Sequence, residues 1–225
     1  MMFAAAHHVQ EVIAGLVSVV FPPHCLLCRT PLEAVGPEEA LCAACGAALP
    51  VHPLPAIAPA DLAWVRAACR YDGAAKRCVL RLKYDARLGL AEPMARRMLA
   101  AAAAVPTWAT DAVLPVPLHA VRARERTFNH AGALAAVVGR GLGVPVLAGT
   151  LVRTRPTAPQ YGLDARHRQR NVRGAFTVQR PATVRGRRLL LVDDVLTTGA
   201  TARACARALT AAGATEVGLL TFAHG

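Results

Sequence analysis

The chain has 225 residues, of which 54% are hydrophobic, and it carries a formal net charge of +12. This length fits one ordinary domain with a small additional module, and the apolar content is ample for a buried core. Residues 1–60 hold one basic and four acidic side chains, whereas residues 61–225 hold 25 basic and 10 acidic ones. An anionic ligand or partner is therefore expected to meet the larger C-terminal part.

The sequence contains no candidate membrane span. No charge-free apolar run reaches the about 18 residues that a transmembrane helix needs. Residues 5–21 are compatible with a short amphipathic helix, and the apolar stretch 12–21 lacks the basic segment and cleavage site of a signal peptide. We expect no membrane insertion and a cytoplasmic location, where the seven cysteines do not form a disulfide framework by default.

Four of the cysteines form two C-x-x-C pairs, Cys25 with Cys28 and Cys42 with Cys45. Two such turns bring four thiolates around one ion, which is the tetrahedral coordination that structural Zn²⁺ prefers. Disulfides or a redox pair are the alternatives, and the lack of a surrounding βαβ pattern disfavours the redox one. Prolines and glycines over 22–46 predict turns rather than a helix. We therefore predict a closed zinc-ribbon module that stabilises the fold and does not catalyse.

The charge of this module limits its role. It is acidic by count, and four thiolates add further negative charge around the metal, so we expect structure or partner docking rather than a grip on phosphates by the module alone. The other cysteines, Cys69, Cys78 and Cys205, lie in apolar or helical patterns and are predicted to be buried thiols. A proline-rich linker then sets the predicted boundary between the module at 1–54 and a larger domain at 55–225.

Strand and helix patterns alternate along the larger domain. This alternation predicts an α/β fold whose mostly parallel sheet has helices on both faces, with ligands at the carboxyl ends of its strands. The predicted strands are 64–71, 111–118, 144–153, 187–194 and 215–223, and the predicted helices are 74–84, 89–103, 127–143 and 199–213.

Two adjacent aspartates, Asp193 and Asp194, end one of the buried strands and precede the turn V-L-T-T-G-A-T. Free N–H groups at the start of the next helix, with the hydroxyls of Thr197, Thr198 and Thr201, suit a phosphate monoester. Two carboxylates suit vicinal sugar hydroxyls or hydrated Mg²⁺. Together they indicate a ribose 5-phosphate site. The plain alternative is a buried strand followed by an aspartate cap and a threonine-rich turn, which requires one aspartate rather than two.

The segment L-L-L-V-D-D-V-L-T-T-G-A-T at 189–201 resembles the phosphoribosyl pyrophosphate (PRPP) motif of type I phosphoribosyltransferases. With 114–135, 151–176 and the leading F-P-P-H-C-L-L-C, nearly the whole chain resembles the ComF family. Members of that family pair an N-terminal zinc finger with a phosphoribosyltransferase fold and are associated with DNA uptake in natural transformation. The segment R-T-F-N at 126–129 departs mildly from the family's usual Arg-Gly-Phe-Asn.

The resemblance implies roles for particular residues. Asp193 and Asp194 would be the catalytic acids, which hold the ribose hydroxyls directly or through Mg²⁺. The arginine-rich loop 154–172 would be a mobile basic lid over the pyrophosphate, with a solvated charged insertion as the alternative. Other expected PRPP contacts are Thr197, Thr198, Gly199, Ala200 and Thr201 for the 5′-phosphate, Pro117, Leu118 and His119 for the pyrophosphate, and Thr157, Gln160 and Arg166 in the lid.

Two functions remain open at this point. The first is a phosphoribosyltransferase that uses PRPP, Mg²⁺ and an unknown acceptor. The alternative is a non-catalytic scaffold that binds single-stranded DNA and docks a helicase-type partner. Because aromatic residues that could stack on bases are few, such a protein would contact mostly the sugar-phosphate backbone of the DNA. Thr197 stands where 6-oxopurine salvage relatives have an aspartate, which disfavours that reaction. Residues 185–222 are similar to amidophosphoribosyltransferases, but their N-terminal cysteine nucleophile has no counterpart. The oligomeric state is open.

Overall fold

The computed structural model describes residues 23–32, 40–49, 51, 54–55, 60–104, 109–118, 128–154, 172 and 174–225. The helix expected at 5–21 and most of the expected lid at 154–172 lie outside these residues. Within the described residues, no helix is both long and apolar enough to cross a membrane. The boundary between 54 and 55 stays a prediction.

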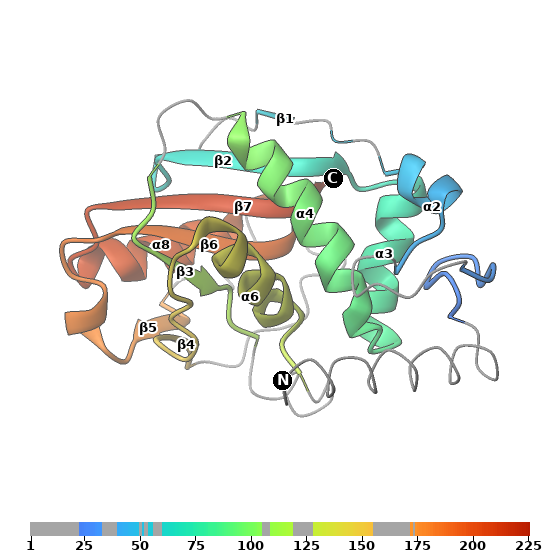
Figure 1. Ribbon diagram of the computed structural model, residues 1–225. Coiled ribbons are helices and arrows are strands. Elements are labelled where there is room, and N and C mark those ends of the chain that lie inside the picture. The colour runs from blue at the N-terminus through green and yellow to red at the C-terminus, as the bar shows by residue number, and fades with distance from the viewer. Residues whose placement is uncertain are drawn as a thin grey trace, which may run out of the picture.

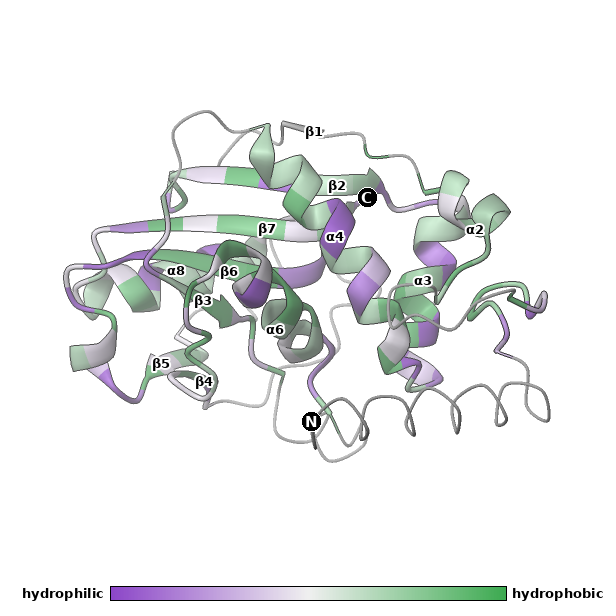
Figure 2. Cartoon of the chain, in the orientation of Figure 1, coloured by the Kyte–Doolittle hydropathy of each residue, from purple (hydrophilic) through white to green (hydrophobic). Residues whose placement is uncertain are grey.

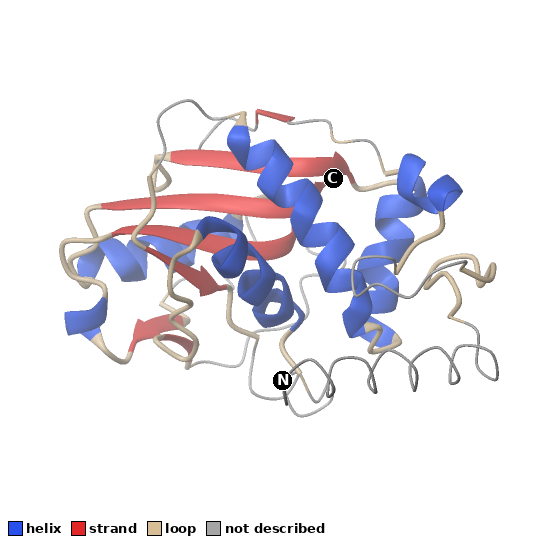
Figure 3. Cartoon of the chain, viewed as in Figure 1, coloured by secondary structure: helices blue, strands red, loops and turns tan. Residues whose placement is uncertain are grey.

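A five-stranded sheet forms the centre of the molecule, in the order β1-β2-β7-β6-β3 (Figures 1 and 3). The pairs β2–β7, β7–β6 and β6–β3 are parallel, and the short edge strand β1 is antiparallel to β2. The predicted mostly parallel sheet is therefore confirmed. The strands are β1 (Leu54–Pro55), β2 (Trp64–Arg70), β3 (Ala112–Pro115), β6 (Arg188–Leu196) and β7 (Glu216–His224).

The central strands of the sheet are rich in apolar residues (Figure 2), and these residues are buried in two cores, one on each face, that helices cover. Leu190 and Val192 of β6 belong to a core shared with α3, α4 and α6, whereas Leu189 and Leu191 belong to a second core shared with α8. This is the packing expected of a parallel sheet with crossover helices. The helices are α3 (Gly73–Tyr84), α4 (Ala91–Ala103), α6 (His130–Leu142) and α8 (Ala200–Ala211), with short 3₁₀ turns η1 (Leu88–Leu90) and η2 (Pro181–Thr183).

A second, two-stranded sheet was not predicted. The strand expected over 144–153 divides, because Val146 bridges Val113 of the main sheet whereas β4 (Leu151–Arg153) pairs antiparallel with β5 (Phe176–Val178). Leu151 and Phe176 are buried in the core that contains α8. The partner strand is three residues long and lies on the far side of the expected lid, so no local pattern indicated it.

The N-terminal cysteine module packs directly on the α/β domain. Cys25, Leu27 and Leu49 are buried in the same core as residues of α3 and α4. Gly46 lies inside a five-residue helix, α2 (Ala43–Ala47), where turns alone were predicted. The N-cap of this helix is Cys42, whose sulfur accepts a hydrogen bond from the backbone N–H of Cys45. The second cysteine pair is thus part of a helix start.

Two arginines attach the module to the helices beneath it. Arg81 of α3 donates from Nη1 to the carbonyl of Leu26 at 2.9 Å. Arg97 of α4 donates from Nε to the carbonyl of Leu49 at 2.9 Å and from Nη2 to that of Gly46 at 2.7 Å. Hydrogen bonds from a charged group to part-buried carbonyls are stronger than neutral ones. Arg97 therefore spans the junction between module and domain.

We expect Arg97→Ala to lower the free energy of unfolding by roughly 2–3 kcal/mol, because it leaves part-buried carbonyls without their charged donor. Urea titration followed by circular dichroism measures the change. Arg77→Ala on α3 is the matched control, since Arg77 is an exposed helical arginine and its loss is expected to cost under about 0.5 kcal/mol. Equal stabilities of the two variants would contradict the proposed junction.

Candidate functional site

The two aspartates of the predicted site lie near the carboxyl end of β6, beside the end of β3. Strand β6 continues past both aspartates to Leu196, two residues beyond the predicted end. The backbone N–H of Val116 donates to the carbonyl of Val192 at 2.9 Å, so the chain leaves β3 next to the aspartates. Pro117 and Leu118 follow at once and are half-buried. The fold thus brings two of the predicted contact segments to one edge.

Asp194 is buried and its charge is balanced within the protein. Its Oδ2 atom lies 2.5 Å from Nζ of Lys83, in the last turn of α3, and 3.5 Å from Nε2 of His130, the first residue of α6. Its side chain is only 4% exposed. The sequence predicted one role for Asp193 and Asp194 together, that of holding the ribose hydroxyls directly or through Mg²⁺. The structure instead distinguishes an internal ion-paired carboxylate from its half-buried neighbour.

The two carboxyl groups therefore titrate differently. Burial, and then the adjacent Asp194 carboxylate, raise the pKa of Asp193 to about 8. Burial would also raise the pKa of Asp194, but Lys83 and then His130 outweigh it and hold that pKa below its usual value. One group is thus held as an anion, and the other accepts a proton near neutral pH. Separated pKa values in adjacent carboxyls are typical of functional sites.

The turn at 197–201 leads into α8, and its Gly199 and Ala200 are buried. Thr197 and Thr198 are exposed, and Thr201 is half-buried in the first turn of the helix. Gly199 has φ 70°, a left-handed conformation that strains any residue with a side chain. The first N–H groups of a helix have no partner inside it and lie at the positive end of its dipole. These features are compatible with an anion ligand, and the phosphate contacts expected at 197–201 stay a prediction.

Sequence reasoning missed Lys83 and His130. Their signals were weak: Lys83 is one of only two lysines among 26 basic residues, and His130 directly follows the N-cap Asn129. The polar atoms of His130, Asp193 and Asp194 lie within 4.8 Å of one another. Carboxylate oxygens suit Mg²⁺. Since Asp194 already pairs with Lys83, Asp193 is the described carboxylate that is better placed to take a ligand.

The other predicted contacts belong to the loop after β3 and to the expected lid. His119, Thr157, Gln160 and Arg166 lie outside the described residues, as do the arginines between 120 and 127. Their roles at the pyrophosphate or in a lid stay predictions.

The four cysteines of the module lie together as the sequence predicted. All four sulfurs are within 4.8 Å of one another, and Cys28 Sγ is 3.5 Å from Cys42 Sγ. Tetrahedral Zn–S bonds of about 2.3 Å separate neighbouring sulfurs by about 3.8 Å. The Thr30 hydroxyl lowers the pKa of Cys28 to about 6, which favours the thiolate that metals bind. The arrangement fits a zinc-ribbon module.

The other three cysteines are buried thiols, as predicted. Cys69, Cys78 and Cys205 are at most 3% exposed. Burial raises the pKa of Cys69 to about 11 and that of Cys78 to about 12, and it raises the pKa of Cys205 as well. These thiols stay protonated at neutral pH and belong to the core.

Comparison with known proteins gives relatives over nearly the whole chain. The family "Phosphoribosyl transferase domain" matches residues 132–225, which include both aspartates and the turn. The DNA utilization protein YhgH of Salmonella typhimurium is 32% identical over 216 residues, covering 87% of this chain and 94% of that protein. Competence protein F of Haemophilus influenzae is 35% identical over 111 residues, covering 48% of this chain and 47% of that protein.

Among solved structures, glutamine phosphoribosylpyrophosphate amidotransferase from B. subtilis, complexed with ADP and GMP, aligns with a TM-score of 0.41. The sequence identity is 22%, over 63% of this chain and 30% of that chain.

We expect the purified chain to contain about one zinc ion, and Cys42→Ser to contain almost none, because a Cys₄ site loses its closed shell with any one ligand. Elemental analysis and release of metal to a chromogenic chelator give the count. Cys78→Ala is the control, since Cys78 is a core thiol outside the cluster. Full zinc content in Cys42→Ser would rule out the four-thiolate site.

Proposed function

Since this chain belongs to the ComF family of phosphoribosyltransferase-like proteins, we propose that it binds PRPP with Mg²⁺ at the carboxyl edge of its parallel sheet. The observation that carries the proposal is the arrangement around the end of β6. Asp193 and Asp194 lie between the start of α8 and the loop that follows β3. An acidic pair beside the start of a helix suits a ligand that has both hydroxyls and a phosphate.

In this proposal the turn at 197–201 holds the 5′-phosphate. The N–H groups at the start of α8, the hydroxyls of Thr197 and Thr198, and the positive end of the helix dipole all favour a phosphate dianion. The left-handed Gly199 allows the backbone to come close to the phosphate oxygens without a side chain between them.

Asp193 takes the ribose hydroxyls or the Mg²⁺ that accompanies PRPP. Asp194 is the buried neighbour, whose charge is paired inside the protein. The Lys83 ammonium keeps Asp194 ionised in its buried position. The acids therefore do not need Mg²⁺ to offset both negative charges in the free protein. Mg²⁺ prefers oxygen ligands and keeps several waters, so one protein carboxylate together with pyrophosphate oxygens suffices for it.

If the site is catalytic, the bond that breaks joins ribose C1 to the pyrophosphate oxygen. Positive charge then develops on the ribose ring and negative charge on the departing diphosphate. Mg²⁺ supplies charge neutralisation on the diphosphate when it is bound. In this proposal the Asp193 carboxylate would face the ribose, where an anion stabilises the developing positive charge. The acceptor that takes the ribosyl group is not identified by these residues.

Handling of DNA is the second candidate function. The relatives are named as a DNA utilization protein and as competence protein F, and basic side chains outnumber acidic ones 25 to 10 over 61–225. We propose that the chain takes part in DNA uptake, where the PRPP site serves either as an active transferase or as a ligand sensor. Release of pyrophosphate from PRPP separates these two: turnover supports the transferase, and binding without turnover supports the sensor.

Asp193→Asn is expected to weaken PRPP binding in the presence of Mg²⁺ by about 10- to 100-fold, because a neutral amide replaces a charged ligand. Titration calorimetry with zinc-loaded protein measures the affinity. Asp72→Asn is the control, since that aspartate lies at the start of α3 with its side chain 72% exposed. Equal affinities in wild type and Asp193→Asn would remove Asp193 from the site.

PRPP·Mg²⁺ affinity is also expected to rise with pH. The pKa of Asp193 is raised to about 8, so below that pH the free protein carries the neutral carboxyl and must lose a proton before it binds a cation. Between pH 7 and the pKa, affinity should rise up to about tenfold per pH unit and then level off above pH 9. Calorimetry in buffers of different ionisation enthalpy detects the released proton. Asp193→Asn should bind without this proton release.

A further inference from the structure

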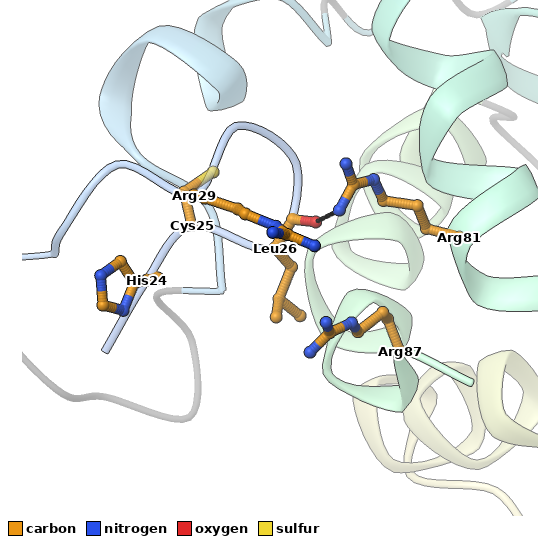
Figure 4. A pocket seen from close by; sticks show the side chains of 6 residues that line it. All are labelled: His24, Cys25, Leu26, Arg29, Arg81 and Arg87. Carbon is orange, nitrogen blue, oxygen red and sulfur yellow. Dashed lines mark hydrogen bonds between the residues drawn. The ribbon is translucent and has the colours of Figure 1, made fainter. Parts of the chain in front are cut away.

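We propose a second anion-binding site, for a phosphate oxyanion, in a pocket between the first cysteine turn and the end of α3. The pocket has a volume of about 260 Å³. It is distinct from the edge of β6 and does not depend on PRPP binding there. Its described lining residues are His24, Cys25, Leu26, Arg29, Arg81 and Arg87 (Figure 4).

Three guanidinium groups line this pocket, and they come from different elements. Arg29 follows the first cysteine pair, Arg81 belongs to the last turn of α3, and Arg87 precedes η1. Among the lining residues that the structure describes, none is acidic. Like charges that line a concave surface add to one electrostatic potential, which attracts a counter-ion. The described lining of the pocket, with three arginines and no carboxylate, therefore favours an anion.

The arginines are partly positioned before any ligand arrives. Arg81 is fixed by its hydrogen bond from Nη1 to the carbonyl of Leu26, drawn in Figure 4. Leu26 in turn packs tightly on η1, since a Cβ on Gly89 would lie 3.0 Å from Leu26 Cδ1. This contact sets the distance between the cysteine turn, which carries Arg29, and the segment that carries Arg87. A guanidinium fork matches two phosphate oxygens at once, which a single ammonium does not.

Backbone conformation gives a second, independent observation. Within the described ranges, the only non-glycine residues with positive φ are Arg29 at 64° and Ala86 at 52°. Arg29 lines the pocket, and Ala86 directly precedes Arg87, so both lie at this one place. Each side chain costs energy in the left-handed region, and such costs concentrate at functional sites. The cysteine turn accounts for the positive φ of residue 29. It does not account for the residue type, because glycine adopts this φ without strain and the chain has an arginine there.

The excess of acidic over basic side chains in the module does not exclude an anion site here. The module contributes one arginine, and the domain contributes two from α3 and the segment after it. The anion is therefore held by both parts together rather than by the module alone. One competing role is that Arg29 offsets the negative charge of the four metal-bound thiolates. That role predicts weaker zinc retention in an Arg29 variant and no change in the binding of anions.

The test uses the zinc-loaded full chain and two probes, inorganic phosphate and a fluorescent oligothymidylate. Arg29→Gly removes the guanidinium and suits φ 64°, so it is expected to fold without strain. Arg87→Gln is the second variant, which removes the charge on the domain side. Arg180→Gln is the matched control, because Arg180 is exposed at the distant start of η2.

Each pocket variant is expected to weaken binding of a phosphate probe at least about fivefold at low salt. For the oligothymidylate, the slope of log affinity against log salt should become shallower by about 0.7 per lost contact. Arg180→Gln should match wild type for both probes. Loss confined to the oligothymidylate supports the site and identifies a nucleic-acid backbone as the source of the phosphate. Loss that includes inorganic phosphate supports a site for small phosphate ligands.

Two results would overturn the proposal. In the first, Arg29→Gly and Arg87→Gln fold cooperatively, keep their zinc and bind both probes as Arg180→Gln does. In the second, Arg29→Gly loses zinc more readily while Arg87→Gln binds both probes like wild type, which assigns the arginine to the thiolate cluster. If Arg29→Gly does not fold, the affinity of Arg87→Gln alone decides between support and rejection.

Discussion

The ion pair between Lys83 and Asp194 is the contact on which the candidate site depends. Two adjacent carboxylates at the end of a buried strand repel each other, and burial disfavours both charges. The Lys83 ammonium, 2.5 Å from Asp194 Oδ2, offsets one of the charges and leaves the other acid to respond to ligand and pH. The pair also joins α3 to β6, so the strand end is held by a helix that is not its sequence neighbour.

Helix α3 connects three parts of the molecule through its last turn and the residues that follow. Arg81 holds a carbonyl of the cysteine module, Lys83 holds Asp194, and Arg87 lines the pocket beside the module. The module shares its core with α3 and α4, so these contacts rest on buried packing and not on surface charge alone. The cysteine module is therefore packed as part of the larger domain's fold. It contacts α3, the helix whose Lys83 also pairs with Asp194.

The two candidate anion sites use different chemistry. At the start of α8, the proposal uses backbone N–H groups and hydroxyls for a phosphate, together with nearby carboxylates for a hydroxylated or metal-bearing part of the same ligand. Beside the cysteine module, guanidinium groups provide charge without any described carboxylate. The first arrangement, as proposed, would select a phosphorylated sugar. The second, as proposed, would recognise the phosphate group alone, which suits a repeated nucleic-acid backbone or a small phosphate ligand equally well.

The sequence by itself determined the features whose residues are neighbours along the chain: the two C-x-x-C turns, the run from β6 through Asp194 into α8, and the alternation that specifies a parallel sheet. Spacing and periodicity report such local relations directly. Tertiary structure alone decided the pairing of β4 with β5, the ion pair of Lys83 with Asp194, and the meeting of Arg29 with Arg87. Those partners lie far apart in the chain, and tertiary packing rather than the sequence period brings them together.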